Sequence, residues 1–145
     1  MTNQNTAPYA ALILRVSLGV LFLAHGALKL FVFTPAGTVG FFESIGLPAI
    51  FAYLTILAEI GGGAALIAGF ATRLVSIATL PILLGAVFLV HGANGWLYTN
   101  PNGGWEFPAF WAATLVVQAL LGDGAYAVRT PKILSLTPDS FARQS

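Results

Sequence analysis

Long apolar stretches, each interrupted by very few polar residues, dominate this chain. A helix needs about 20 apolar residues to cross the hydrocarbon core of a bilayer. Four stretches are near that length, approximately residues 9–33, 50–70, 74–90 and 108–128. The pattern therefore predicts an all-α, polytopic membrane protein in which four transmembrane helices form a bundle.

The segments outside the predicted spans differ in character. Residues 34–49 contain several phenylalanine, isoleucine and leucine residues around a single acidic side chain, Glu43, which indicates a short interfacial helix in the first outer loop. Residues 130–145 are polar and contain two prolines, as is typical of a flexible end. We therefore expect one membrane domain over residues 1–129 and a flexible cytoplasmic tail over residues 130–145.

The composition supports a bilayer as the surroundings of this chain. Hydrophobic residues make up 57% of the sequence and charged residues only 8%, against about 25% charged in an average soluble domain. The net charge of +1 provides no concentrated basic surface, so nucleic acid is not an expected partner. The absence of cysteine excludes thiolate-held clusters and disulfides.

The distribution of lysine and arginine predicts how the chain is oriented, because these residues favour the cytoplasmic ends of spans. With a cytoplasmic N-terminus, Arg73, Arg129, Lys132 and Arg143 all lie inside, and only Lys29 lies toward the outer side. We therefore expect a multi-pass protein of the cytoplasmic (inner) membrane with both termini in the cytoplasm.

Glu59 stands near the middle of the second apolar stretch, and Arg15 and His25 lie inside the first. A charge at the bilayer centre costs about 2.5–3.5 kcal/mol on insertion scales, so it must face protein and find a partner. Counted along the helices, Glu59 lies between Arg15 and His25 in depth, which predicts an Arg15–Glu59 ion pair. The pair could only fix helix register; alternatively, Glu59 and His25 handle a proton or bind a ligand.

Small residues predict that the first two spans cross closely. Gly19 and Gly26 fall on the same side of the first helix as Arg15 and Phe22. In the second span, small residues recur every four positions, at Gly61, Ala65 and Gly69. Such spacing lets the backbones of membrane helices approach each other.

Further candidate ligand-binding residues lie toward the outer side. Lys29 is near the outer end of the first span, and His91 and Glu106 close the outer ends of the third and fourth spans, where they could meet. Phe22 and Trp105 could line a ligand ring. The simpler alternatives are that Lys29 extends to the interface, that Trp105 belongs to an aromatic belt, and that His91 and Glu106 are exposed caps. No metal-ligand spacing is present, so no metal is expected.

Four pieces of sequence resemble the DoxX family of membrane proteins: RVSLGVLFLAHGALKLF (15–31), GLP (46–48), LAEIGGGAALIAGFATR (57–73) and GGWEFPAFW (103–111). Their order and spacing, from about Leu12 to Val128, carry the resemblance. It implies a small four-helix bacterial or archaeal membrane protein. The family is named for its association with thiosulfate:quinone oxidoreductase, and other members are linked to redox or oxidative-stress complexes. One departure is that the terminal Ser-Leu-Asp of many members is absent after Gly122-Asp123-Gly124.

The resulting hypothesis is a membrane subunit of an oxidoreductase or redox-stress complex that binds a quinone or a lipid-like ligand. His25 and Glu59 would handle protons, and the ligand-binding set adds Arg15, Lys29, Phe22, Trp105, Glu106 and His91. No covalent cofactor is expected. A redox partner subunit would supply electrons, because no electron-carrier motif is present. The alternatives are a non-catalytic scaffold that recruits a partner and, less favoured, a small transporter acting as a homo-oligomer.

Overall fold

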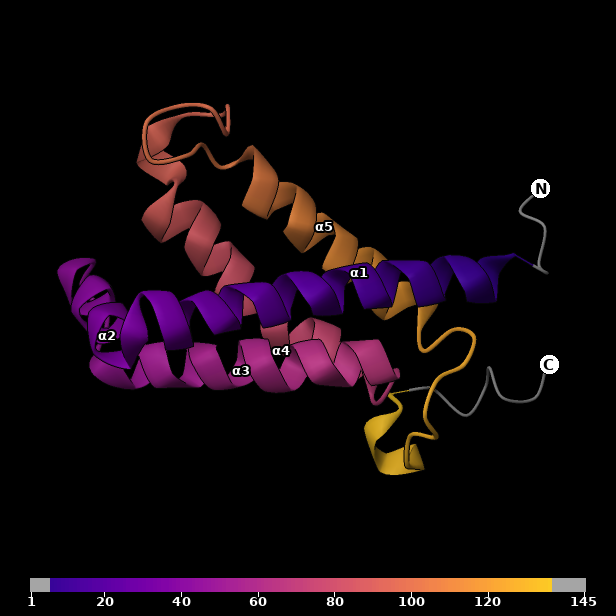
Figure 1. Cartoon of the computed structure of the whole chain (residues 1–145). Helices are drawn as coiled ribbons and strands as arrows, with labels where there is room; N and C mark the ends of the chain where they lie inside the picture. The colour runs from indigo at the N-terminus through magenta and orange to yellow at the C-terminus, as the bar shows by residue number, and fades with distance from the viewer. Residues whose placement is uncertain (1–5, 137–145) are drawn as a thin grey trace.

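The computed structural model describes residues 6–136, which form helices joined by loops, with no strand in that range (Figure 1). Two of the long helices end in a π-helical segment, labelled η. In chain order the main elements are α1 (Ala7–Ala27), η1 (Leu28–Val32), α2 (Thr34–Ser44), α3 (Ala49–Ala68), α4 (Thr72–Gly85), η2 (Ala86–Val90) and α5 (Glu106–Leu121). Short 3₁₀ turns lie at Gly92–Asn94 and Lys132–Leu134. The prediction of an all-α protein is confirmed, and α2 is the short helix predicted within residues 34–49.

Within residues 6–136, three continuous helices are long and apolar enough to cross a membrane: Ala7–Val32, Ala49–Ala68 and Thr72–Val90. The fourth apolar helix, α5, has 16 residues, or about 24 Å at 1.5 Å per residue, which is less than the ~30 Å hydrocarbon core. The prediction that this helix reaches Val128 is wrong. It ends at Leu121 because Gly122 takes a left-handed φ of +84°, and the Gln118 side chain donates to the Gly122 carbonyl at 2.8 Å.

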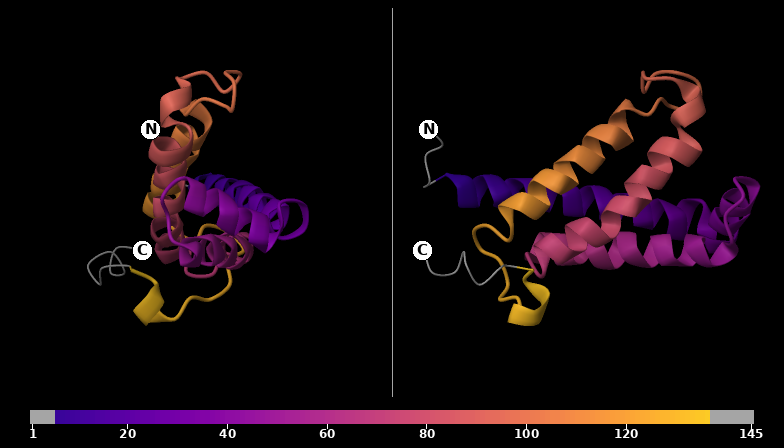
Figure 2. Two further views of the ribbon diagram at one scale, coloured as in Figure 1. Left: turned by 90° about the vertical axis from the view of Figure 1, so that its left-hand side faces the viewer. Right: turned by 180° about the vertical axis from the view of Figure 1, so that it is seen from behind.

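The helices form two pairs. α1 and α3 lie side by side and run antiparallel, while α4 and α5 form a hairpin that crosses them obliquely (Figures 1 and 2). The hairpin meets the first pair near the chain termini and diverges from it toward the opposite end (Figure 2). We call these two ends the terminal end and the loop end, the latter containing α2 and residues 91–105. α2 packs on α3 and η1.

The crossing of α1 and α3 depends on two opposed glycines. A Cβ atom at Gly19 would lie 2.7 Å from the Gly63 carbonyl oxygen, and one at Gly63 would lie 2.8 Å from the Gly19 carbonyl oxygen. The close crossing predicted for these spans is therefore confirmed. The predicted ladder is wrong at Gly61, because a Cβ there would meet nothing within 4 Å. Gly63, two positions further along α3, makes the contact instead.

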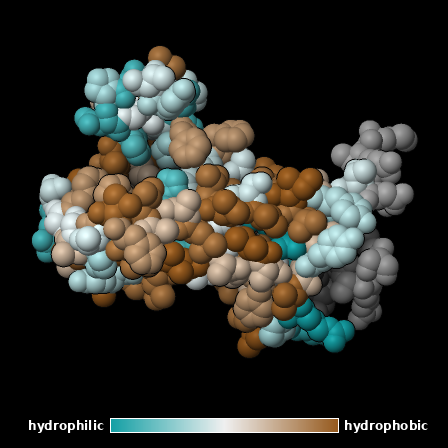
Figure 3. Space-filling model, in the orientation of Figure 1, coloured by the Kyte–Doolittle hydropathy of each residue, from teal (hydrophilic) through white to brown (hydrophobic). Residues whose placement is uncertain are grey.

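The core lies where the two helix pairs meet. It contains Leu18, Phe22, Leu66, Leu83, Trp111, Ala112 and Leu115. Away from this core the surface remains apolar: Phe31 is 80% exposed, and Phe88 and Leu120 are each 73% exposed. Figure 3 shows this apolar surface across the middle of the molecule, with hydrophilic residues gathered toward its ends. Lipid is the solvent that suits such a surface.

The beginning of the predicted tail is attached to the bundle. The Val128 amide donates to the Ala68 carbonyl at 3.0 Å, and the Ala71 amide donates to the Thr130 hydroxyl at 2.9 Å. These bonds hold the chain leaving α5 against the α3–α4 turn. The rest of the predicted flexible tail, residues 137–145, lies outside the described residues.

Candidate functional site

Glu59 forms an ion pair with Lys29. The Lys29 Nζ donates to Glu59 Oε1 at 2.8 Å, the Glu59 residue is 3% exposed, and the Lys29 side chain is 18% exposed. The glutamate thus faces protein and has a charged partner, as the cost of burying a charge in a bilayer requires. The partner is not the predicted one: the Arg15–Glu59 ion pair does not form.

The direction of the side chains explains this difference. Measured from the Gly19–Gly63 contact, Glu59 lies ~6 Å and Lys29 ~15 Å toward the loop end, whereas Arg15 lies ~6 Å toward the terminal end. Cα–Cβ bonds tilt toward the N-terminus of a helix. Because α1 and α3 are antiparallel, Lys29 and Glu59 tilt toward each other and Arg15 tilts away from Glu59. The depth of each residue in the bilayer could not by itself predict which basic side chain pairs with Glu59.

Arg15 instead closes the terminal end of the bundle. Its guanidinium donates to the carbonyl oxygens of Leu66 and Ala125, each at 2.9 Å, and to that of Ile67. The last carbonyls of a helix lack their regular partners within it, and Leu66 and Ile67 occupy the last turn of α3, where the Leu66 carbonyl also accepts from the Gly69 amide at 3.1 Å. Arg15 is 1% exposed and donates to buried backbone groups, which indicates a structural role.

A cavity of about 920 Å³ occupies the loop end between the two helix pairs. Its walls come from α1, η1, α2, α3, α4, η2 and α5. Four predicted site residues lie on its wall, namely His25, Lys29, Glu59 and His91. Most of the remaining lining is apolar, as at Phe42, Phe51, Leu54, Ile82 and Leu89. Of these, Phe51, Leu54 and Leu89 are about half exposed, at 47%, 50% and 52%, so the cavity reaches the lipid-facing surface.

Both π-helical segments border this cavity. In η1 the Phe33 amide donates to the Leu28 carbonyl at 2.8 Å, and in η2 the His91 amide donates to the Ala86 carbonyl at 2.9 Å. Each bond spans five residues, the π-helical pattern that often marks functional sites within α-helices. Lys29 lies within η1 and His91 directly follows η2. Lys29 and His91 therefore lie at local distortions of their helices.

His25 has a fixed orientation on the cavity wall. Its Nδ1 lies 2.9 Å from the Leu21 carbonyl oxygen, which can only accept, so Nδ1 carries the proton. The ring packs edge-to-face on Trp111, with centroids 4.9 Å apart. In the neutral ring Nε2 is then an acceptor, and it has no hydrogen-bond partner among residues 6–136.

Trp111 is a cavity residue that the sequence analysis did not select. It is 4% exposed, its ring packs on both His25 and Phe22, and its Nε1–H is buried without an acceptor within the described range. Its position at the end of the GGWEFPAFW stretch, beside Trp105 and Glu106, could have pointed to it. Its long separation from His25 along the chain concealed their contact.

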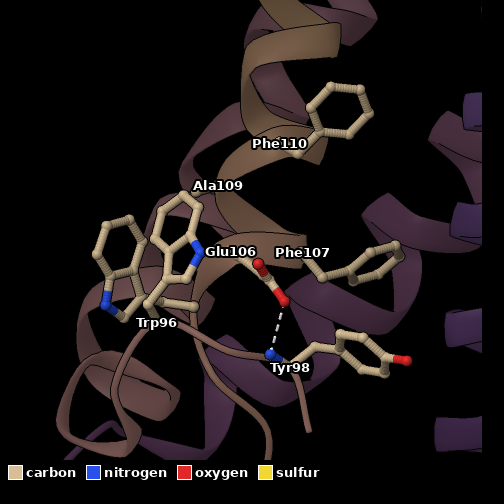
Figure 4. A pocket seen from close by; sticks show the side chains of 7 residues that line it. Trp96, Tyr98, Glu106, Phe107, Ala109 and Phe110 are labelled. Carbon is tan, nitrogen blue, oxygen red and sulfur yellow. Dashed lines mark hydrogen bonds between the residues drawn. The ribbon is translucent and has the colours of Figure 1, made fainter.

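Besides Arg15, three predicted ligand-binding residues lie outside this cavity. Phe22 is fully buried in the core, with its ring 4.8 Å from that of Trp111. Trp105 and Glu106 line a separate aromatic groove of about 940 Å³ formed by the loop and the start of α5 (Figure 4). There Glu106 Oε1 accepts from the Tyr98 amide at 2.8 Å, and Trp105 stacks edge-to-face on Trp96. Trp105 and Glu106 therefore order the loop and do not line the cavity.

His91 and Glu106 also do not meet as one sequence interpretation suggested. The His91 Nδ1 lies 2.9 Å from the Gly103 carbonyl oxygen, so the imidazole holds the loop that leads into α5. Between residues 6 and 136, no three His, Cys, Asp or Glu side chains are grouped closely enough to hold a metal ion.

Comparison with known proteins places this geometry in context. Residues 10–92 match the family model described as DoxX. The chain is 30% identical to the inner membrane protein YqjF of Escherichia coli (strain K12) over 125 residues, which cover 81% of this chain and 87% of that protein. It is 40% identical to the "Putative oxidoreductase CatD" of Bacillus subtilis (strain 168) over 79 residues, 54% of this chain and only 58% of that protein. No solved structure matches.

Proposed function

Because this chain belongs to the DoxX family, we propose that it is an inner-membrane protein that binds a quinone-type ligand as a subunit of a redox complex. The observation that supports this most is the cavity at the loop end. It combines a mostly apolar lining with one buried ion pair and two histidines.

The cavity suits an amphipathic ring in size and chemistry. Its volume of about 920 Å³ falls within the ~300–1,000 Å³ typical of small-molecule pockets. Lys29 uses one N–H for Glu59, which leaves two for a ligand carbonyl oxygen. The aromatic and aliphatic lining would surround the ring, and the lipid-facing mouth would let a hydrocarbon tail remain in the bilayer.

We propose that a partner protein supplies the electrons. The chain has no cysteine, so it cannot hold a thiolate-bound cluster. The relative in Bacillus subtilis is named a putative oxidoreductase, and the relative in Escherichia coli is named an inner membrane protein. The first name agrees with a redox role and the second with a location in the inner membrane.

The orientation with both termini in the cytoplasm stays a prediction. Its support is that Arg73, Arg129 and Lys132 lie at the terminal end, whereas Lys29, near the loop end, is turned inward to Glu59. The chain lacks cysteine, so a single cysteine at Asn100 is a clean probe. A membrane-impermeant thiol reagent should label it from outside intact cells, and labelling only after lysis would reverse the orientation.

Quinone binding can be tested on purified protein in lipid nanodiscs. We expect a decyl-tailed benzoquinone to quench tryptophan fluorescence saturably, because Trp111 lies on the cavity wall. Glu59→Gln should weaken binding about tenfold, which corresponds to about 1.4 kcal/mol. Without its carboxylate partner, the Lys29 ammonium should turn toward the interface and no longer donate to the ligand.

Glu43→Gln is the matched control, since it makes the same chemical change at an exposed position of α2 that does not line the cavity. It should leave the binding curve unchanged. If the folded wild-type protein gives no saturable quenching and purifies without quinone, the proposal fails. A scaffold role for the bundle would then be the better explanation.

A further inference from the structure

We infer that the cavity discriminates between the two redox forms of its ligand and binds the hydroxyl-bearing quinol more tightly than the quinone. This inference rests on the proposed function and specifies which form the site recognises. It follows from which hydrogen-bonding groups on the cavity wall are already occupied and which remain free.

The first free group is an acceptor. Because the His25 Nδ1–H is directed to the Leu21 carbonyl, the neutral ring presents Nε2 as a lone-pair acceptor. Edge-to-face packing on Trp111 holds the ring plane. Glu59 Oε2 also has no donor in the described part of the chain, but it is fully buried and a ligand in the cavity does not reach it. A quinone cannot satisfy His25 Nε2, because a quinone has no O–H or N–H.

The second free group is a donor. Lys29 Nζ carries three protons and gives one to Glu59 Oε1. Of the two redox forms, only the quinol has a group that can use both sides of such a site, since its phenolic hydroxyl donates through its proton and accepts through its oxygen. A quinone carbonyl can use only the Lys29 side. A hydroxyl placed between Nε2 and Nζ therefore makes one more hydrogen bond than a carbonyl in the same position.

The same arrangement provides a route for the proton of the bound hydroxyl. The O–H bond would break as an N–H bond forms at His25 Nε2, giving a phenolate next to the Lys29 ammonium and an imidazolium beside Trp111. No electron moves in this step, so it needs no oxidant. Lys29 would stabilise the developing negative charge on oxygen, as a positioned cation does for other oxyanions.

The test compares three ligands on wild-type protein in nanodiscs: a decyl-tailed benzoquinone, its quinol kept reduced under argon, and the dimethyl ether of that quinol. We expect the quinol to bind about five- to tenfold more tightly than the quinone, the effect of one additional hydrogen bond. The dimethyl ether has the shape of a substituted quinol but no O–H, so it should bind no better than the quinone. Equal or tighter quinone binding would overturn the inference while leaving the proposed function intact. Failure of all three ligands to bind would reject both.

His25→Phe identifies the residue responsible. Phenylalanine preserves the aromatic packing on Trp111 but has no acceptor. The affinity for the quinone should therefore change little, and the quinol should bind about as tightly as the quinone. If His25 had only a structural role, the His25→Phe change would instead weaken the binding of both ligands equally. Persistence of the full preference in a folded His25→Phe protein would contradict the assignment.

Discussion

Replacing Lys29 with methionine should lower the free energy of unfolding by about 4 kcal/mol, and replacing Glu59 with leucine should lower it by about 3 kcal/mol. Each change leaves one charge of a buried pair without its partner. The lysine change should cost more because Glu59 is 3% exposed, whereas the Lys29 side chain is 18% exposed and can move toward the interface. Unfolding by SDS in mixed micelles, followed by circular dichroism, measures both values.

The double variant Lys29→Met/Glu59→Leu provides the control. Replacing a whole buried ion pair with apolar side chains of similar size is often close to neutral. We therefore expect the double variant to lose about 1 kcal/mol or less, which gives a strongly non-additive cycle. Additive losses would mean that the two side chains act independently, and that the 2.8 Å contact contributes nothing to stability.

A methyl group at Gly63 should destabilise the protein by about 1–3 kcal/mol, the usual effect of overpacking a filled interface. In Gly63→Ala the new Cβ would lie 2.8 Å from the Gly19 carbonyl oxygen, 2.9 Å from a Leu23 side-chain carbon and 3.0 Å from the Leu23 amide nitrogen. Two of these three atoms are backbone, so α1 and α3 must move apart. The same unfolding assay in mixed micelles measures the loss.

Gly61→Ala is the matched control because the two glycines share a helix and a sequence context, yet a Cβ at Gly61 would meet nothing within 4 Å. Alanine favours helix over glycine by about 1 kcal/mol in water. The Gly61→Ala protein should therefore be as stable as the wild type or slightly more stable. A Gly61→Ala protein that is destabilised as much as Gly63→Ala would show that helix conformation, and not the α1–α3 contact, determines the result.

The hydrophobic pattern predicted much of the fold because lipid imposes a simple rule on it. Apolar stretches of sufficient length must become helices. α3 follows its predicted span closely, and so do α1 and α4 when their π-helical ends, η1 and η2, are included. The end of α5 could not be obtained in this way. Hydropathy does not define where a helix ends, and α5 ends where Gly122, followed by Asp123 and Gly124, takes a positive φ of +84°.

The candidate site was predicted in part. His25, Lys29, Glu59 and His91 share one cavity, and the requirement that a buried charge needs a partner correctly predicted that Glu59 faces protein beside a charged side chain. The identity of that partner depended on side-chain direction in antiparallel helices, which depth along the membrane does not reveal. Trp111 was not selected because aromatic residues near a membrane boundary are common, and only the packed structure separates it from Trp105.

The three hydrogen bonds of Arg15 also bear on the order in which the protein is made. Two of its acceptors belong to α3, but the third, Ala125, lies 110 residues beyond Arg15 along the chain. If the helices insert in the order of their synthesis, the first helix enters the bilayer before the final acceptor of its cation has been made. Translation must then proceed past α5 before the set of acceptors is complete.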